Sequence, residues 1–260
     1  MPIAPFPMLT IATLNINNYE NHWLERRELL IAEILNLQPD LLALQEVRIS
    51  AGQAGWICSQ LNARLGQQQY HLVQQRRSRW WRSGRDGVAL ISRLPMLAHD
   101  TISLGYDGCV ALRANIELPT GYMVDVVSTH LHRPWRQPEV REEQMMKIVG
   151  WLNDRGGASH QIIAGSLNEI PSGMAIAYAK QQYLSAYAAV HGREPMATWP
   201  TAMIRSENDW AGCLDYIFVN HAFKVINTRL ICTTPHPEND TLYPSDHVGL
   251  LTQLQLRPSA

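Results

Sequence analysis

Short apolar runs that stop at a polar residue recur along this chain, and they limit the folds that it can adopt. Residues 8–16 form one such run, with Asn15 near its end, and residues 40–45 form another, which Glu46 follows. Both have the length and the apolar or β-branched content of strands. Residues 20–37 change to a helical period and stop before a proline. Strand, helix and strand in this order predict a βαβ-like unit in which Asn15 and Glu46 emerge at the same edge of a sheet.

The same pattern continues through the rest of the chain. Further strands are predicted over residues 86–92, 109–118, 122–129, 161–164, 214–219, 223–232 and 248–256, and further helices over residues 52–65 and 138–153 and in a short segment from Ser172. The polar residues at the strand ends or starts are Asp86, His130, Ser166 with Asn168, Asp215, and Asp246 with His247. Each of them alone is explained by a turn. Because they recur at the same end of successive buried strands, together they predict a functional site.

The composition is that of an ordinary soluble globular protein. The formal net charge of −1 over 260 residues offers no overall attraction to nucleic acid or to an anionic membrane. The four cysteines are scattered, and we interpret them as buried free thiols, with two disulfides as the alternative. No run approaches the roughly 20 apolar residues of a membrane span, and residues 1–10 do not have the pattern of a leader. We expect a cytoplasmic monomer with one domain over residues 1–260 and its core over residues 9–256.

The residue types at the strand ends fit phosphoester chemistry with a divalent metal. Magnesium is commonly held by one or two carboxylates and completes its shell with water and substrate phosphate. Glu46 and Asp246 are the best ligand candidates, with Asn15 close by. His130 and His247 can donate to phosphate oxygens or move protons. No serine or cysteine stands out as a nucleophile, so the pattern favours attack on phosphorus by water.

Six motifs in a fixed order resemble a known superfamily. They are Asn15, Leu-Gln-Glu ending at Glu46, Ser-Thr-His at 128–130, Gly-x-Leu-Asn at 165–168, Leu-Asp-Tyr-Ile-Phe at 214–218 and Ser-Asp-His at 245–247. In this order they resemble the endonuclease/exonuclease/phosphatase superfamily, whose fold is similar to that of pancreatic deoxyribonuclease and of the exonuclease-III-type AP endonucleases. The resemblance implies an α/β fold of two packed, mostly antiparallel β-sheets flanked by helices, which is a four-layer sandwich.

The resemblance also implies how a metal and the scissile phosphate are bound. Glu46 is the main ligand of Mg²⁺ or Mn²⁺, and Asn15 and Asp246 lie beside the metal or its water shell. His247, paired with Asp215, contacts the scissile phosphate and serves acid/base or transition-state roles.

Three further residues receive roles from the same resemblance. His130 is a second histidine that contacts phosphate, and Asp86 is a candidate partner for it. Asn168 donates a hydrogen bond to a phosphate oxygen or helps to orient the nucleophile.

Ser166 is a catalytic position at which this chain departs from the family pattern. The pattern is Gly-Asp-x-Asn, and its Asp is thought to position or deprotonate the attacking water, or to ligate a second metal. A serine hydroxyl is a poor base and carries no charge, and loss of such a group costs on the order of 10² to 10⁴ in rate. Three interpretations stay open: a deliberate inactivating substitution, a natural variant that works more slowly or with another base, and a protein that binds without cleaving.

Two segments rich in arginine and tryptophan, residues 76–85 and 132–136, favour a nucleic acid or nucleotide substrate. Arginine makes bidentate phosphate contacts, and tryptophan offers a stacking face for a base. Arg85, Arg133 and Trp135 are therefore candidates for substrate binding, together with Asn15. The alternative is an Arg-rich solvated surface with its tryptophans packed against the core. Without a long basic track, single-stranded or short substrates are favoured over duplexes.

Two other functions stay open at this point. A non-catalytic protein would keep the pocket and bind a phosphate ligand without turnover, because of Ser166. A lipid phosphoesterase, either sphingomyelinase-like or acting on phosphoinositides, would use the pair Trp80-Trp81 at a lipid interface.

Overall fold

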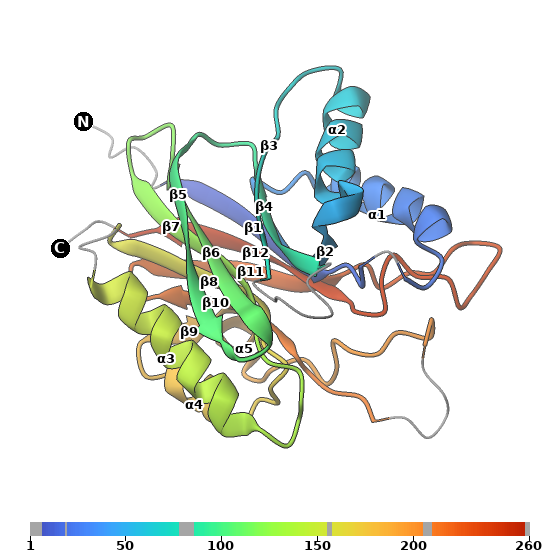
Figure 1. The fold of residues 1–260 in the computed structure, drawn as a ribbon. Helices are drawn as coiled ribbons and strands as arrows, with labels where there is room; N and C mark the ends of the chain where they lie inside the picture. Colours follow the sequence, from blue (N-terminus) through green and yellow to red (C-terminus); the bar gives the residue numbers. More distant parts are fainter. Residues whose placement is uncertain (1–6, 19, 78–85, 155–157, 205–209, 258–260) are drawn as a thin grey trace.

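Two six-stranded sheets face each other in the computed structural model, which describes residues 7–18, 20–77, 86–154, 158–204 and 210–257 (Figure 1). The first sheet has the order β11 (Phe223–Ile231), β12 (Gly249–Leu256), β1 (Met8–Asn15), β2 (Leu41–Arg48), β4 (Asp86–Ser92) and β3 (His71–Arg76). The second has the order β5 (Met96–Gly105), β6 (Cys109–Glu117), β7 (Met123–His130), β8 (His160–Ser166), β10 (Asp215–Asn220) and β9 (Tyr183–Ser185).

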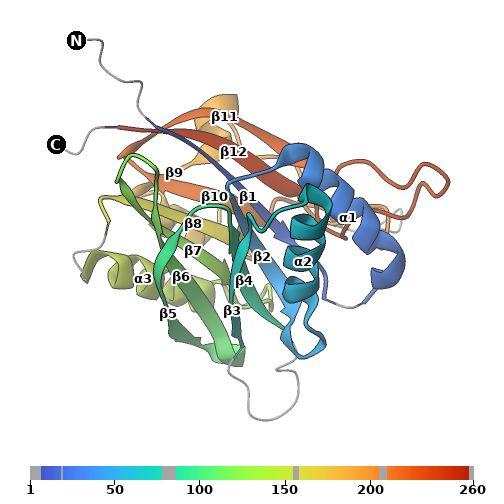
Figure 2. The ribbon, with the colours of Figure 1, turned by 90° about the horizontal axis from the view of Figure 1, so that it is seen from above.

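Helices cover the outer face of each sheet. The helix α1 (Trp23–Leu37) and its neighbour α2 (Gln53–Leu65) pack on the first sheet, while α3 (Pro138–Asp154) and α4 (Met174–Ala179) pack on the second. The short helix α5 (Ala186–His191) lies against β10 and β11, and two turns of 3₁₀ helix, η1 (Ile49–Ala51) and η2 (Tyr106–Gly108), lead into α2 and β6. Figure 2 shows the same arrangement from above, with α1 and α2 on one side of the two sheets and α3 on the opposite side. The four-layer α/β sandwich implied by the resemblance is confirmed.

Most strand pairs are antiparallel, as expected. In the described part of the chain, two pairs are parallel, β1 with β2 and β7 with β8, and each is joined by a crossover helix, α1 in the first sheet and α3 in the second. This connection is the usual one, because the chain must return to the same end of the sheet before it can add a parallel strand. The ends of β1, β2, β7 and β8 therefore point toward the same end of the sandwich as the starts of their antiparallel neighbours β4, β10 and β12.

The apolar core between the sheets sets which side chains reach this end. In β8, Ile162 and Ala164 pack between the sheets, whereas Ile163 packs on the outer face against the helices. Alternate residues of a strand lie on the same face, so Ser166 continues the inward row. In β7, Val126 belongs to the same inner cluster, and His130 continues its row. The inner rows thus turn from apolar to polar at one end of the sandwich.

The bounds of several elements differ from the expectations, and three strands were not expected at all. The helix expected over residues 20–37 begins at Trp23, and the strand expected over 40–45 continues to Arg48. The strand expected over 161–164 covers His160–Ser166. The unpredicted strands are β3, β5 and β9, and each lies at the edge of its sheet. An edge strand buries fewer side chains, and β5 is mostly exposed, so its sequence carries a weak apolar signal.

In the part of the chain that the structure describes, no helix is both long and apolar enough to cross a membrane.

Candidate active site

A cleft of about 640 Å³ lies at the polar end of the sandwich. Glu46, Asn168 and His247 line it, and of these Glu46 and His247 are almost completely buried. The remaining lining residues are Arg133, Trp135, Arg141, Glu169, Ile170, Trp199, Trp210 and Leu214. Trp135 and Trp210 are 74% and 54% exposed, so these two aromatic residues extend to the mouth of the cleft, while Glu46 and His247 lie deeper.

Glu46 enters the cleft from a β-bulge at the end of β2. The register between β2 and β4 shifts between Gln45 and Val47, and Glu46 has a φ of 54°, in the left-handed region. A bulge of this kind changes the direction of a side chain, and its strain is typical of functional sites. Parallel pairing sets Asn15 opposite Gln45, and the Asn15 Nδ2 donates to Glu46 Oε1 at 3.2 Å. The expectation that Asn15 and Glu46 emerge at the same edge is confirmed.

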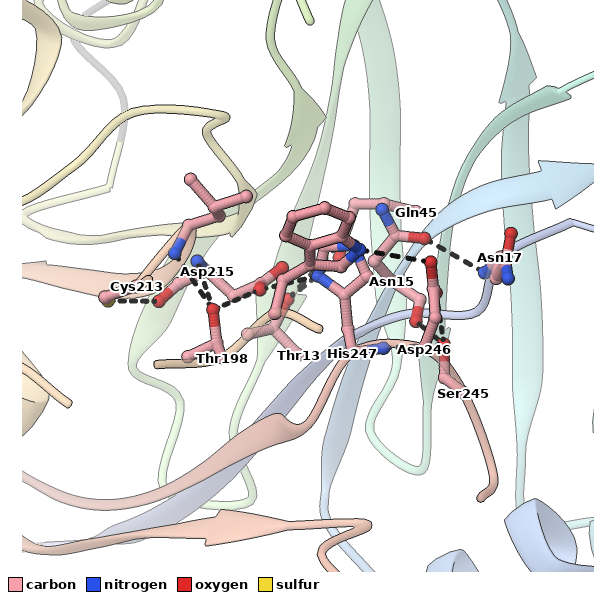
Figure 3. Close-up of polar contacts among 12 residues, drawn as sticks. Thr13, Asn15, Asn17, Gln45, Thr198, Cys213, Asp215, Ser245, Asp246 and His247 are labelled. Carbon is pink, nitrogen blue, oxygen red and sulfur yellow. Dashed lines mark hydrogen bonds and ion pairs between the residues drawn. The ribbon is translucent and has the colours of Figure 1, made fainter. Parts of the chain in front are cut away.

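His247 forms a buried pair with Asp215 (Figure 3). The His247 Nδ1 lies 2.8 Å from Asp215 Oδ2, which also accepts a hydrogen bond from Thr198 Oγ1 at 2.6 Å. Burial alone lowers the pKa of His247, but the charge and hydrogen bond of Asp215, with the charges of Asp246 and Glu46, outweigh burial and raise it to about 9. His247 is therefore protonated at neutral pH, and its other ring nitrogen is a charged donor.

Asp246 lies beside this pair and is held by its own hydrogen bonds. The Trp199 indole Nε1 donates to Asp246 Oδ2 at 3.2 Å, and Ser245 Oγ donates to Asp246 Oδ1 at 3.2 Å. Ser245 Oγ also lies 2.6 Å from the backbone oxygen of Asn15, so the segment before β12 is tied to the end of β1 (Figure 3). Glu46 and Asp246 thus flank the end of β1, one from β2 and the other from the segment before β12, and the charges of both act on His247.

His130 is buried and neutral. Burial first, and then the positive charges of Arg77, Arg133 and His247, hold its pKa well below the usual histidine range. Its Nε2 is 3.8 Å from Glu46 Oε1, and neither ring nitrogen has a hydrogen-bond partner among the described residues. The two histidines therefore differ in charge at neutral pH, because Asp215 supports a charge on His247.

Ser166 lies in the middle of a row of three polar residues. It pairs with His130 of β7 on one side and with Asp215 of β10 on the other. Ser166 is fully buried, and within the described chain its Oγ and Asp215 Oδ1 have no hydrogen-bond partner. Unpaired buried polar atoms are rare, and a group of them requires an explanation. Here they surround the position at which the family pattern has a carboxylate.

The glycine before Ser166 is required by the packing of β7 against β8. A Cβ atom at Gly165 would lie 2.0 Å from the backbone oxygen of Thr129. Beyond Ser166, Asn168 has a φ of 50° and its Nδ2 donates to the backbone oxygen of Leu131 at 2.9 Å. The turn thus fixes the side chain of Asn168 against the end of β7 while Asn168 also lines the cleft.

These geometries agree with the comparison to known proteins. The sequence model of the Endonuclease/Exonuclease/phosphatase family matches residues 12–247. The chain belongs to this family. Membership of this family supports a hydrolase that acts on phosphoesters. A comparison with curated proteins found no match to the sequence.

Solved structures share the fold of this family member at low sequence identity. An endonuclease/exonuclease/phosphatase from Bacteroides vulgatus is 20% identical, with a TM-score of 0.77 over 96% of this chain and 100% of the other. The human Nocturnin catalytic domain with bound sulfate anion is 24% identical, with a TM-score of 0.77 over 96% and 94%. D. rerio TDP2 complexed with single strand DNA product is 17% identical, with a TM-score of 0.75 over 95% and 99%.

Two expected site residues lie elsewhere or cannot be placed. The Asp86 carboxylate lies 3.5 Å from Arg77 Nη1, and the structure does not pair it with His130, so that expectation is corrected. Asp86 begins β4, next to the end of β3, and Arg77 just after β3 pairs with its carboxylate. Arg85 and the pair Trp80-Trp81 fall outside the described residues. Arg133 and Trp135 do line the cleft.

The structure adds residues that sequence reasoning missed. Thr198 and Trp199 contact Asp215 and Asp246, and Arg141 pairs with Glu169 through Nε and Oε2 at 3.0 Å. None of these four residues continues the row of apolar side chains along a strand, so the pattern of polar residues at strand ends did not predict them. The only available signal was an arginine near the start of a helix, where a cation is locally unfavourable.

The residues at the cleft fit a magnesium or manganese ion. The carboxylates of Glu46 and Asp246 and the amide of Asn15 are hard oxygen donors, which these ions prefer. Over the described ranges, no three histidine, cysteine, aspartate or glutamate side chains form a group that could hold a metal. The two carboxylates and one amide therefore suit an ion that keeps several water ligands and binds substrate phosphate, rather than an ion that the protein surrounds completely.

Proposed function

We propose that this chain is a divalent-metal-dependent phosphodiesterase for single-stranded nucleic acid or nucleotides, and that Ser166 slows its turnover. The observation that carries the proposal is the buried pair of His247 and Asp215, whose histidine lines the same cleft as Glu46. A fixed cation beside carboxylates that can bind a metal suits a phosphate diester, whose negative charge increases at the oxygens during displacement.

The chain's own residues provide the contacts to phosphate. Charged His247 donates a hydrogen bond to a phosphate oxygen and stabilises the charge that develops there. Asn168 supplies an amide donor from the turn after β8. His130, whose pKa lies well below the usual range, is neutral and offers one ring N–H that can donate a hydrogen bond to a phosphate oxygen. Arg133, whose Nη1 is 3.8 Å from Glu46 Oε1, can contact an outer phosphate oxygen.

The metal is assigned to the acidic side of the cleft. Glu46 and Asp246 would hold Mg²⁺ or Mn²⁺, with Asn15 at its edge. When bound, the ion neutralises phosphate charge and lowers the pKa of a coordinated water. Asp246 is oriented for this role by Trp199 and Ser245.

The aromatic residues at the mouth favour a substrate with bases. Trp135 and Trp210 both line this cleft and are exposed. The Trp210 ring lies 6.2 Å from that of Trp199, so two indoles form one apolar surface beside His247. Stacking on an aromatic ring is worth about 1–3 kcal/mol per base and tolerates any base. This arrangement supports a short or single-stranded substrate.

Ser166 supports a second candidate, a protein that binds its ligand without cleaving it. The hydroxyl carries no charge, it is buried, and it has no partner among the described residues. It therefore cannot replace the base or ligand that a carboxylate would provide at this position.

A substrate panel distinguishes the candidates. The chain and its Ser166→Asp variant are assayed with Mg²⁺ and Mn²⁺ on single-stranded DNA, RNA, an abasic duplex, bis(p-nitrophenyl) phosphate and sphingomyelin vesicles, with His247→Ala as the inactive control. We expect cleavage of single-stranded substrates, strongest in Ser166→Asp. Tight oligonucleotide binding without product from either protein would identify a binding protein. Turnover of sphingomyelin alone would identify a lipid enzyme.

A further inference from the structure

Two buried arginines occupy matching places in the two halves of the fold. Arg26 is the fourth residue of α1, and Arg141 is the fourth residue of α3. Each follows the end of its preceding strand by the same number of residues, from Asn15 in β1 and from His130 in β7. Both side chains are almost completely buried, at 0% and 2% exposed.

Arg141 joins two segments that line the cleft. Its Nη1 donates to the backbone oxygen of Pro134 at 2.7 Å, and its Nη2 to that of Trp135 at 3.2 Å. Its Nε donates to Glu169 Oε2 at 3.0 Å, directly after Asn168. One guanidinium thus ties the loop with Arg133 and Trp135 to the turn after β8.

Arg26 makes the equivalent connection in the first sheet. Its Nη2 donates to the backbone oxygens of Asn17 and Asn18 at 3.1 and 3.0 Å, in the loop that leaves β1. Its Nη1 donates to the backbone oxygen of Pro244 at 2.9 Å, in the segment that leads into Asp246 and His247. In each half, the arginine ties the loop after its own strand to the motif segment of the neighbouring strand.

Local physical chemistry does not favour an arginine at these positions. The start of a helix carries a partial positive charge, which disfavours a cation in the first turn, and a buried guanidinium must satisfy all five of its donors. Burial lowers the pKa of Arg26 to about 10, and the charges of Asp246 and Glu46 act in the opposite direction. Backbone oxygens of the loop after β1 and of Pro244 accept the hydrogen bonds of Arg26, whereas Arg141 has the carboxylate of Glu169 in addition to backbone oxygens.

We propose that Arg26 and Arg141 are matched positioning residues, each of which holds a strand-end loop and the adjacent motif segment of the cleft in a fixed relation. Neither is a catalytic residue. The proposal deepens the proposed function, because it rests on the cleft as the place where a phosphodiester binds. Arg141 positions Arg133, Trp135 and Asn168, and Arg26 positions the segment that carries Asp246 and His247.

Amide hydrogen exchange by mass spectrometry tests the positioning without any need for activity. The full chain is compared with Arg26→Met and Arg141→Met, with Arg27→Met and Lys147→Met as controls on the same two helices. We expect Arg141→Met to accelerate exchange at residues 131–137 and 167–170, and Arg26→Met at residues 17–21 and 243–247, each roughly tenfold or more. The other pair of segments stays unchanged. Uniform acceleration in either variant, or none in its own pair of segments, would overturn the proposal.

A second set of variants covers the case in which loss of an arginine prevents folding. Arg141→Met leaves the carboxylate of Glu169 buried and without a partner. The double variant Arg141→Met/Glu169→Gln removes that buried charge. Arg141→Lys keeps a positive charge beside Glu169. We expect the double variant and Arg141→Lys to fold. We expect both to show accelerated amide exchange at residues 131–137, because neither retains the several N–H donors of the guanidinium. Exchange equal to that of the parent chain in both would contradict the proposal.

Ligand binding separates a positioning role from a merely structural one. Binding of a fluorescein-labelled single-stranded oligonucleotide is measured by anisotropy, and turnover is measured in the Ser166→Asp background. Arg141 holds the binding residue Trp135, and stacking on such a ring is worth about 1–3 kcal/mol per base, so misplacement of Trp135 weakens binding rather than the chemical step. We expect Arg141→Lys to raise Kd and KM about tenfold with little change in kcat, and the unfolding midpoint to stay near that of the control. An unchanged Kd together with local exchange would overturn the positioning role. If no protein in the set turns over any substrate, the proposed function fails while the exchange result still decides the proposal.

Discussion

The Nδ1 of His247 lies 2.8 Å from Oδ2 of Asp215, and this contact sets the charge of the histidine. Both side chains are buried, and Thr198 holds the same carboxylate oxygen from the other side. His247 comes from the segment before β12 in the first sheet, whereas Asp215 begins β10 in the second. The pair therefore joins the first sheet to the second at the end where the cleft lies. It forms only when both sheets have packed against each other.

Asp215→Asn should lower the pKa of His247 from about 9, because burial then acts without the opposing charge. The folded-state value lies above the ordinary 6.5, so the pair stabilises the fold fully below about pH 6.5 and this stability is lost as pH rises through about 9. Its size is at most about 3 kcal/mol. Urea unfolding at pH 6 and pH 10 measures it, with Asp154→Asn as the exposed control. An equal pH dependence in parent and Asp215→Asn would contradict the assignment.

His130 should have the opposite pH dependence. Its folded-state pKa lies well below the usual value, so the unfolded chain binds the proton more readily. Stability is then lost as pH falls below about 6.5, and His130→Gln should reduce that loss. Titration of the imidazole signals by NMR gives a direct measurement. A His130 resonance that titrates near pH 6.5 would show that the ring is not held neutral.

The sequence predicted the parts of the site that lie on strands. Asn15 and Glu46 were placed at one edge because a βαβ unit aligns the ends of parallel strands, and His130, Ser166 and Asp215 continue the apolar inner rows. Arg141 and Trp199 were missed because they act from a helix and a loop through tertiary contacts, which leave no periodic signal. Asp86 lies beside Arg77 rather than His130, and a tertiary contact of this kind also leaves no periodic signal in the sequence.

Trp199→Phe should weaken metal binding while it keeps an aromatic ring in the cleft. The indole Nε1 orients Asp246, and loss of a group that orients a ligand costs about 10 to 100 fold in metal affinity. Binding of Mn²⁺ by electron paramagnetic resonance measures this without substrate. Trp210→Phe is the matched control, since Trp210 contacts the ring of Trp199 and lines the same cleft. Equal loss of affinity in both variants would remove the special role of Trp199.

Trp135→Ala should weaken binding of single-stranded oligonucleotides by about 1–3 kcal/mol if the indole stacks on a base. The Trp135 side chain is 74% exposed, so the change should leave the free energy of unfolding nearly unchanged. Leu24→Ala on α1, which is 60% exposed and does not line the cleft, controls for a change in surface apolarity. Affinity that is equal in Trp135→Ala and Leu24→Ala would argue against a base at this side of the cleft.

The unpaired polar atoms around Ser166 lead to the most direct test. His130 and Asp215 flank Ser166 on adjacent strands, and all three have buried polar atoms without partners in the described chain. An aspartate at this position would restore a charged group that can orient or deprotonate water. The necessary neighbours, His247 with Asp215 and the carboxylates of Glu46 and Asp246, are already in place.

The decisive measurement is kcat/KM of the chain and of Ser166→Asp, with Mg²⁺, on one single-stranded oligonucleotide and on bis(p-nitrophenyl) phosphate. We expect Ser166→Asp to be faster by about 10² to 10⁴, and this gain to disappear when the metal is chelated or when His247→Ala is combined with it. Equal rates in the two proteins, with Ser166→Asp correctly folded, would contradict the claim that a carboxylate missing at position 166 limits turnover.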